Sequence, residues 1–507
     1  MKKITLLIGL FLFVCAGVIG QTTADKNLPE FQIQQYEVES MLRFLASDEL
    51  KGRRTGSEGN HIAARYLASH LEAYGFKPGA GDNGYFQKVP LAIAKPPASS
   101  QLKVDKTEYT FQKDYIILGG NAADLNTTAI FAGHGWVDEA ENIDDYADLD
   151  VAGKVVFVLS GQPGANDRMA AFNAMPIKRK IAQEKGAVAL IEIYNLNFPW
   201  NFFMRYFGGE RIRIDNERPG EDQSLLYGWV KNIVKEDIFS QMKAGETFKI
   251  SFSSSGGRKE EVRSNNVIGV LEGSDPELKD EYVLMTAHYD HVGVGKQGGR
   301  FTAEDSIFNG ARDNAMGTIA LLTAAKTLSQ KRPKRSIIAL AVTGEEIGLL
   351  GSSYYAENPL IPLDQTIFDL NTDGAGYNDT RYISVIGFGR TGTDEAINAA
   401  AAAAGLDVFP DPAPKQGLFD RSDNVSFAKK GIPAMNVSPG MTAFDDEINK
   451  YYHQVTDEAE TVDMAYFLKY CQAFAHLARL IADDSDRPMW KEGDKYEEAG
   501  KGLYGNE

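Results

Sequence analysis

The amino-acid sequence predicts an α/β protein, a three-layer sandwich with a mixed, largely parallel sheet, interrupted by a second, mostly β domain. Three observations support this prediction. With 507 residues, the chain is too long for one ordinary domain. From residue 265 onward, apolar segments alternate with helical segments, which is typical of a largely parallel sheet covered by helices. Between about 100 and 260, short β-like runs dominate instead.

The elements are expected in the following order. Residues 30–99 form the first part of the main domain, with two helices within 36–75 around the loop 51–60. Residues 100–262 form the β-rich insert, with a helix near 176–185 and strands at 127–136, 154–161 and 187–195. Residues 263–485 complete the main domain, with helices at 314–330, 393–405 and 463–483 and strands at 266–273, 282–287, 336–343, 365–371, 381–387 and 432–438. Residues 486–507 are polar and Gly-rich, and we expect a loosely held tail.

Composition and charge exclude some classes of protein. Hydrophobic residues make up 43% of the chain and charged residues 24%, as in globular proteins. The formal net charge of -17 argues against nucleic-acid binding, which requires a basic surface. This charge is compatible with an exported, soluble protein.

The N-terminus has the pattern of a signal peptide. Lys2 and Lys3 precede an apolar run that ends in small residues such as Gly20. A membrane anchor needs ~20 apolar residues; this run is slightly short, and no basic stop-transfer cluster follows it. We therefore expect residues 1–20 to be removed, leaving no membrane span and a periplasmic or extracellular protein. Lipidation at Cys15, which bulky Val14 disfavours, and a retained anchor are the alternatives.

Only two cysteines are present, Cys15 and Cys471. Removal of the signal peptide leaves Cys471 alone, so an intramolecular disulfide is excluded. Cys471 lies among apolar residues at helical spacing, including Phe467 and Phe474, which predicts a buried structural thiol.

Potential metal ligands follow the predicted strands. In open α/β sheets, active sites lie outside the carboxyl ends of strands. Taken singly, each position has a plainer explanation: an Asp before a helix is usually an N-cap, and a lone His is usually structural. Their succession at strand ends and Gly-rich turns predicts a shared site, formed by His288 and Asp290, Asp313, Glu345 and Glu346, Asp373, and His453. Two His and three carboxylates suit a pair of divalent ions with one bridging carboxylate. Nitrogen and oxygen donors without thiolate favour zinc, with cobalt or manganese as alternatives.

These motifs resemble a known family. The order H-x-D, D-N-A-x-G, E-E-x-G-L-x-G-S, N-x-D-x-x-G, S-D and Y-H-x-x-x-D is similar to that of the co-catalytic dizinc exopeptidases. That superfamily holds secreted bacterial aminopeptidases, glutamate carboxypeptidases and glutaminyl cyclases. The resemblance covers most of the chain, including residues 44–60 and 421–440. The insert, especially residues 147–163, resembles a protease-associated (PA) domain.

The resemblance implies two Zn2+ ions per chain and a role for each ligand. His288 and Asp373 would hold one ion, Glu346 and His453 the other, and Asp313 would bridge both, with a cis peptide bond to Asn314. The Asp290 side chain would hydrogen-bond His288 and fix its tautomer. Glu345 would be the general base that takes a proton from the metal-bridging water. Tyr452 would either donate a hydrogen bond to the tetrahedral oxyanion or serve in packing.

Some residues depart from the family pattern or stay outside it. Arg312 stands where many members have an acidic residue, and Asn424 where His is common; neither is a ligand position, so both should bear on substrate preference. The spacing of the motifs does not require His291 as a ligand. The aromatic stretch 197–209 either packs the insert against the main domain or forms a hydrophobic lid over the metal pair.

The function that follows is a secreted metallo-aminopeptidase acting on the N-terminal residues of peptides. A carboxypeptidase would need a basic pocket for the terminal carboxylate, which the sequence does not clearly show. A glutaminyl cyclase uses one zinc ion and would not need all five ligands. A non-catalytic binding protein is disfavoured because all five ligands and the base are present. The preferred substrate side chain, the role of the insert and the oligomeric state are left open.

Overall fold

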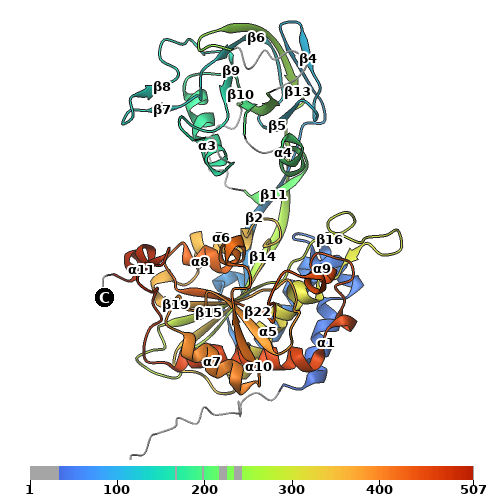
Figure 1. Ribbon diagram of the computed structural model, residues 1–507, viewed down its shortest axis with the longest axis vertical. Helices are drawn as coiled ribbons and strands as arrows, with labels where there is room; N and C mark the ends of the chain where they lie inside the picture. The colour runs from blue at the N-terminus through green and yellow to red at the C-terminus, as the bar shows by residue number, and fades with distance from the viewer. Residues whose placement is uncertain (1–32, 166–167, 197–198, 216–224, 233–241, 506–507) are drawn as a thin grey trace, which may run out of the picture.

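The computed structural model describes residues 33–505, apart from 166–167, 197–198, 216–224 and 233–241. The predicted signal peptide and Cys15 lie outside this part. Within it, no helix has both the length and the apolar character needed to cross a bilayer. The chain forms a larger body and a smaller lobe, joined by long strands (Figure 1).

The larger body is built on a ten-stranded mixed sheet. Its centre is four parallel strands, which are β18 (Ser336–Val342), β15 (Tyr282–His288), β19 (Thr366–Thr372) and β22 (Ala434–Pro439). The strands next to this centre run antiparallel to it on both sides, so the sheet is mixed. On one side lie β14 (Arg258–Leu271), β2 (Phe86–Lys95), β11 (Arg211–Ile214) and the short β1 (Lys77–Pro78); on the other lie β20 (Tyr382–Ile386) and β21 (Asp407–Pro410).

Helices cover both faces of this sheet, which confirms the predicted three-layer sandwich. Alternate residues of β18 face opposite layers: Ile337 packs in one hydrophobic cluster and Ile338 in another. The first layer contains α1 (Gln35–Leu45), α2 (Glu58–Ala73), α5 (Met316–Gln330), α7 (Asp394–Ala403) and α10 (Met464–Asp483). The second contains α6 (Leu350–Glu357), α8 (Asn424–Ala428) and α11 (Glu497–Tyr504).

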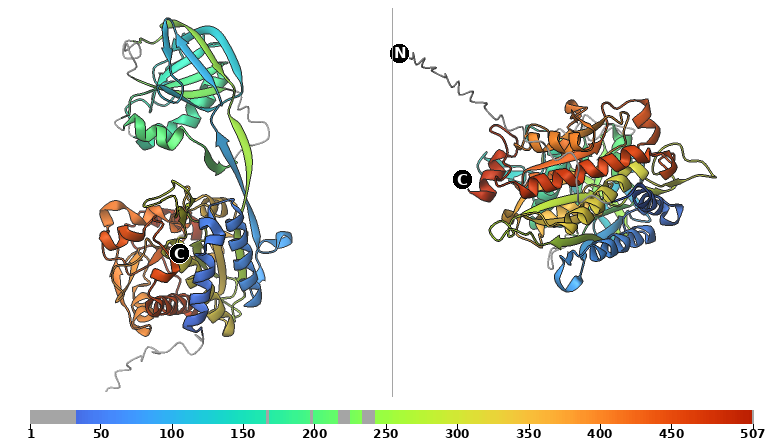
Figure 2. Two further views of the ribbon diagram at one scale, coloured as in Figure 1. Left: turned by 90° about the vertical axis from the view of Figure 1, so that its right-hand side faces the viewer. Right: turned by 90° about the horizontal axis from the view of Figure 1, so that it is seen from below.

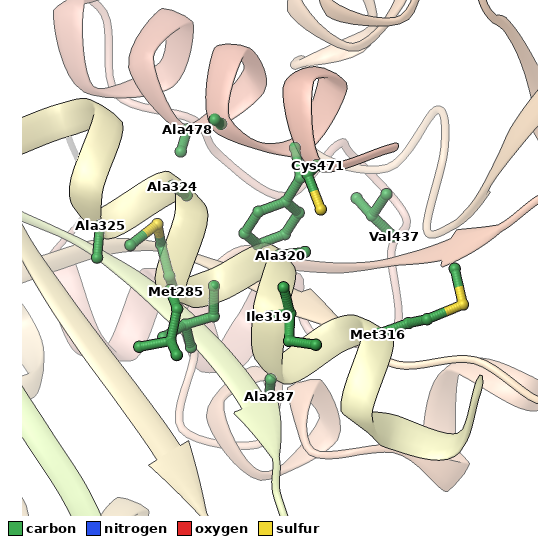
Figure 3. Packing of buried hydrophobic residues seen from close by; sticks show 14 of the residues in the cluster. Met285, Ala287, Met316, Ile319, Ala320, Ala324, Ala325, Val437, Cys471 and Ala478 are labelled. Carbon is green, nitrogen blue, oxygen red and sulfur yellow. The ribbon is translucent and has the colours of Figure 1, made fainter. Parts of the chain in front are cut away.

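Cys471 is a buried structural thiol, as expected. Its side chain is fully buried between α5 and α10, among Ile319, Ala320 and Val437 (Figure 3). Burial raises the pKa of this thiol to about 12, which disfavours the reactive thiolate.

The smaller lobe is built on an eight-stranded sheet and carries two helices, α3 (Arg168–Glu184) and α4 (Trp200–Phe207). In spatial order, its strands are β4 (Thr107–Tyr109), β3 (Ser100–Val104), β13 (Thr247–Ser254), β6 (Ala123–Phe131), β9 (Val155–Leu159), β10 (Ala189–Tyr194), β12 (Leu226–Lys231) and β5 (Tyr115–Gly119). Strands β2 and β14 connect the lobe to the body (Figure 2). Strand β11 falls within the sequence range of the insert, yet it pairs with β2 in the sheet of the body.

The aromatic stretch differs from both of its interpretations. On α4, Trp200 and Phe203 are buried and pack against Tyr194 and Trp229 inside the smaller lobe. The indole Nε1 of Trp200 donates to the backbone oxygen of Lys113, 2.9 Å away in the same lobe. The lid and the interdomain contact are therefore wrong for these two side chains, whereas residues 197–198 lie outside the described part.

The C-terminal segment is also not a loose tail. Trp490 and Tyr496 are buried, and α11 follows them. The indole of Trp490 donates to the backbone oxygen of Gly431, and Arg390 pairs with Asp494 at 2.7 Å. Buried aromatic side chains, a hydrogen bond and an ion pair together hold this polar segment on the body.

Candidate metal centre

Three parallel strands bring most of the predicted site residues to one edge of the sheet. Strand β15 ends at His288, directly opposite the last residue of β18, and β19 ends just before Asp373. The turn after β18 carries Glu345 and Glu346. Asp313 precedes α5, and His453 follows the short helix α9 (Asp446–Tyr451).

The five predicted ligands form two groups that share Asp313, and His291 lies within reach of the group that contains Glu346 and His453. In one group, His288 Nε2 lies 3.2 Å from Asp373 Oδ1 and 3.5 Å from Asp313 Oδ1. In the other, His453 Nε2 lies 3.1 Å from Glu346 Oε2 and 3.2 Å from Asp313 Oδ2. Donors about 2.0–2.2 Å from one tetrahedral ion lie roughly 3.3–3.5 Å from each other. The donor set therefore fits two ions, with the two oxygens of Asp313 facing different positions.

Buried polar contacts hold Asp313 in this orientation. Its peptide bond to Asn314 is cis. The carboxylate of Asp457 accepts hydrogen bonds from the backbone nitrogens of Arg312 and Asp313, at 2.9 Å and 3.3 Å. The same carboxylate pairs with the guanidinium of Arg312 at 3.1 Å, and both side chains are almost fully buried. Asp457, the last residue of the Y-H-x-x-x-D motif, thus supports the backbone at the carboxylate that is predicted to bridge the two ions.

The expected effect of Arg312 and Asn424 on substrate preference cannot come from direct contact in the cavity. The guanidinium of Arg312 is committed to Asp457 and lies 3.7 Å above the ring of Tyr451. Asn424 is fully buried and donates from Nδ2 to the backbone oxygen of Phe419. Neither residue lines the cavity next to the metal ligands.

Asp290 supports His288 through its backbone, not through its carboxylate as expected. The backbone oxygen of Asp290 lies 3.2 Å from His288 Nδ1, whereas the nearer carboxylate oxygen is 4.0 Å away. The carboxylate instead accepts hydrogen bonds from Thr55 Oγ1 at 2.8 Å and from the backbone nitrogen of Glu345 at 3.3 Å. The residue therefore orients both a ligand and the proposed base.

Glu345 and Glu346 have opposite electrostatic environments. The turn after β18 contains Gly344 in the left-handed region, at φ 75°, which lets the chain redirect the two side chains. Burial raises the pKa of Glu345 well above its usual range. Burial also opposes ionisation of Glu346, but His291 and His453 outweigh it and hold that pKa well below the usual range. Glu345 is therefore suited to carry a proton, and Glu346 to remain an anionic ligand.

Two of the predicted ligands, His288 and His453, have raised pKa values. Burial opposes the charge of His453, but hydrogen bonds to Asp313 and Glu346 raise its pKa to about 11. Neighbouring carboxylates, Asp373 foremost, likewise raise the pKa of His288 despite its burial. Metal binding must displace these protons, so metal affinity should weaken as the pH falls.

A cavity of about 90 Å³ opens beside the predicted ligands. The carboxylates of Asp313, Glu345, Glu346 and Asp373 line one part of it. An apolar part is lined by Ile386, Leu418, Met441, Phe444 and Tyr452. The ring of Tyr452 lies 4.2 Å from that of His453, so its placement is compatible with both the oxyanion and the packing interpretations.

One residue that the sequence interpretation set aside lies inside the site. His291 is 1% exposed, and its Nδ1 lies 2.6 Å from Glu346 Oε1. Its nearness to His288 and Asp290 along the chain is the only signal in the sequence, and spacing alone could not show which carboxylate it reaches.

Comparisons with known proteins relate part of the chain to a peptidase family. Residues 266–478 match the profile of Peptidase family M28. A vacuolar membrane protease of Saccharomyces cerevisiae is 34% identical over 227 residues, which are 44% of this chain and 20% of the relative. Aminopeptidase YwaD of Bacillus subtilis is 28% identical over 204 residues, or 39% of this chain and 40% of the relative. The chain thus spans between a fifth and two fifths of these relatives.

Among solved structures, the aminopeptidase from Aneurinibacillus sp. strain AM-1 has a similar fold. It superposes with a TM-score of 0.54 at 19% sequence identity, over 92% of this chain and 98% of that one. Because the superposition includes most of both chains, the similarity of fold extends beyond residues 266–478.

Proposed function

We propose that this protein, whose residues 266–478 match the profile of Peptidase family M28, is an exported metallo-aminopeptidase that uses two zinc ions to remove N-terminal residues from peptides. The observation that carries the proposal is the placement of Asp313, whose two oxygens face different sets of donors. A donor set of imidazoles and carboxylates suits zinc.

Each residue of the site has a chemical task in peptide hydrolysis. When bound, the two ions would polarise the scissile carbonyl and lower the pKa of a water molecule. Glu345 lines the cavity beside the ligands and takes the proton of the attacking water, then passes it to the leaving amine. Burial, which raises its pKa, makes the Glu345 carboxylate a stronger proton acceptor. Tyr452 lines the same cavity, and its hydroxyl can donate a hydrogen bond to the developing oxyanion.

The apolar wall of the cavity supports a preference for substrates with apolar first residues. We expect cleavage of leucyl-aminomethylcoumarin and no cleavage of its N-acetyl derivative, because an aminopeptidase requires the free amine. Treatment with a chelator should abolish the activity, and added zinc should restore it. Equal cleavage of the blocked substrate would contradict the aminopeptidase assignment, and activity that survives chelation would contradict the metal assignment.

A single observation favours carboxypeptidase activity as the second candidate. Arg421 is exposed at the cavity and has no ion pair with any described residue. An unpaired guanidinium there can bind the terminal carboxylate of a peptide. The sequence alone did not show this basic group, because nothing in it placed Arg421 beside the ligands.

The variant Arg421→Ala separates the two candidates. If the protein is an aminopeptidase, Arg421→Ala should keep the wild-type kcat on leucyl-aminomethylcoumarin. Neither the wild type nor the variant should then cleave acetyl-Leu-Leu. Carboxypeptidase activity would be established instead if the wild type cleaves acetyl-Leu-Leu. The KM for this substrate should then be higher in Arg421→Ala, and the rise in KM should be smaller in Arg421→Lys. The Lys variant is the matched control because it keeps the positive charge.

The proposal also includes export of the protein and the assignment of the smaller lobe as a PA-like domain. Lys2, Lys3 and the apolar run that follows support a cleaved signal peptide. The sequence of residues 147–163 supports a PA-like lobe. Mass spectrometry of protein recovered outside the cytoplasm tests export: a mature chain starting at Gln21 is expected, and an uncleaved chain would argue for an anchor.

A further inference from the structure

We propose that His291 is a positioning residue of the metal centre: its Nδ1–H donates to Oε1 of Glu346 and leaves Oε2 as the oxygen that faces the ion. The inference rests on the proposed two-metal function. It assigns a task to a histidine that is not one of the five ligands.

The distances distinguish a hydrogen-bond donor from a ligand. His291 Nδ1 lies 2.6 Å from Glu346 Oε1 but 3.9 Å from the nearest oxygen of Asp313. The other oxygen of Glu346, Oε2, faces His453 at 3.1 Å. The donors around a tetrahedral ion lie roughly 3.3–3.5 Å apart. His291 is too close to one donor and too far from the other, so its geometry is that of a charge-assisted hydrogen bond.

The surroundings of His291 fix the direction of Nδ1. The ring is buried and meets the ring of His453 edge-on, with centroids 5.6 Å apart. On another side the ring lies against Gly310, where an added Cβ would come within 2.5 Å of the imidazole. Because the ring is enclosed in this way, its hydrogen bond can hold the Glu346 carboxylate in one orientation.

One short loop then supports both metal positions. His288 begins the loop as a ligand in one group, and His291 ends it as a support for a ligand in the other. The loop is anchored between them by Arg53, whose Nε donates to the backbone oxygen of Tyr289 at 2.9 Å. Partners of this kind orient metal ligands, and their loss typically weakens metal binding by about 10–100-fold.

Two substitutions separate a positioning role from ligation. In His291→Asn, the side-chain amide can donate from near the position of Nδ1, whereas His291→Ala has no donor. An amide is a poor zinc ligand, so the Asn variant restores a hydrogen bond but not a metal bond. His134→Ala, in the smaller lobe, is the matched control for the loss of a histidine far from the site.

The experiment titrates the metal-depleted mature protein with zinc in competition with a chelator, and records the visible spectrum of the Co2+ form. We expect His291→Ala to bind one of the two ions about 10–100-fold more weakly than the wild type does. His291→Asn should bind both ions nearly as tightly as the wild type, with an unchanged Co2+ spectrum. His134→Ala should match the wild type.

Two results would overturn the positioning role of His291, and a third would overturn the proposed function. If His291→Asn weakens zinc binding as much as His291→Ala does and also alters the Co2+ spectrum, His291 is a ligand and the positioning role is overturned. If Ala binds both ions like the wild type, His291 has no role at the site. If the wild type binds fewer than two ions, the proposed function fails, and the contrast between Ala and Asn on the remaining ion still decides the role of His291.

Discussion

Replacing Glu345 by Gln is expected to lower kcat by about 10²–10⁴-fold while the protein still binds two zinc ions. Glutamine has nearly the same shape as glutamate, so the packing of this largely buried position should survive. It cannot accept the proton of the attacking water, so the chemical step fails. The measurement is kcat on leucyl-aminomethylcoumarin together with the zinc content of the purified protein.

The neighbouring residue provides the matched control. Glu346→Gln makes the same chemical change one position along, but at a carboxylate that lies 3.1 Å from His453 in the ligand set. We expect that variant to lose zinc as well as activity. If Glu345→Gln keeps nearly full activity, or loses as much zinc as Glu346→Gln, the division of tasks between the two glutamates is wrong.

The second large effect is expected at Asp313. Its Oδ1 faces His288 and its Oδ2 faces His453, so Asp313→Ala removes a donor from both groups at once. We expect zinc content to fall below one ion per chain and activity to fall by roughly 10³-fold or more, because the ions provide several kcal/mol of transition-state stabilisation.

Asp373→Ala is the control for this prediction. Asp373 faces only His288, so its loss should release one ion and leave the other bound. Metal analysis after dialysis against a weak chelator distinguishes the two variants. If Asp313→Ala retains two ions, or loses no more than Asp373→Ala does, Asp313 does not bridge the two positions.

The fold of the larger body could be predicted because its strands are buried on both faces. Segments such as 282–287 and 336–343 are apolar throughout and are separated by helical segments, which few other architectures can accommodate. The same regularity made it possible to predict ligand positions, since His288 and Asp373 lie where two of these strands end. The sequence predicted a mixed, largely parallel sheet, but it did not show which strands run antiparallel to the centre, because their direction depends on contacts between distant segments.

The remaining features depend on contacts between segments far apart in the chain. The aromatic residues of α4 indicate burial, but only the structure shows that Trp200 and Phe203 pack inside the smaller lobe. The supports of the site were missed for the same reason: local spacing does not reveal that His291 reaches Glu346, or that Asp290 serves His288 through its backbone oxygen. Arg421 likewise became a candidate only once it was placed at the cavity.

The most direct test of the two-metal aminopeptidase is the zinc titration of the metal-depleted protein, with cleavage of leucyl-aminomethylcoumarin as the readout. The two sets of donors around Asp313 predict that activity rises with added zinc and reaches its plateau at two ions per chain, while the N-acetyl substrate stays uncleaved throughout. Full activity in the metal-depleted protein, or a plateau at one ion per chain, would contradict the account.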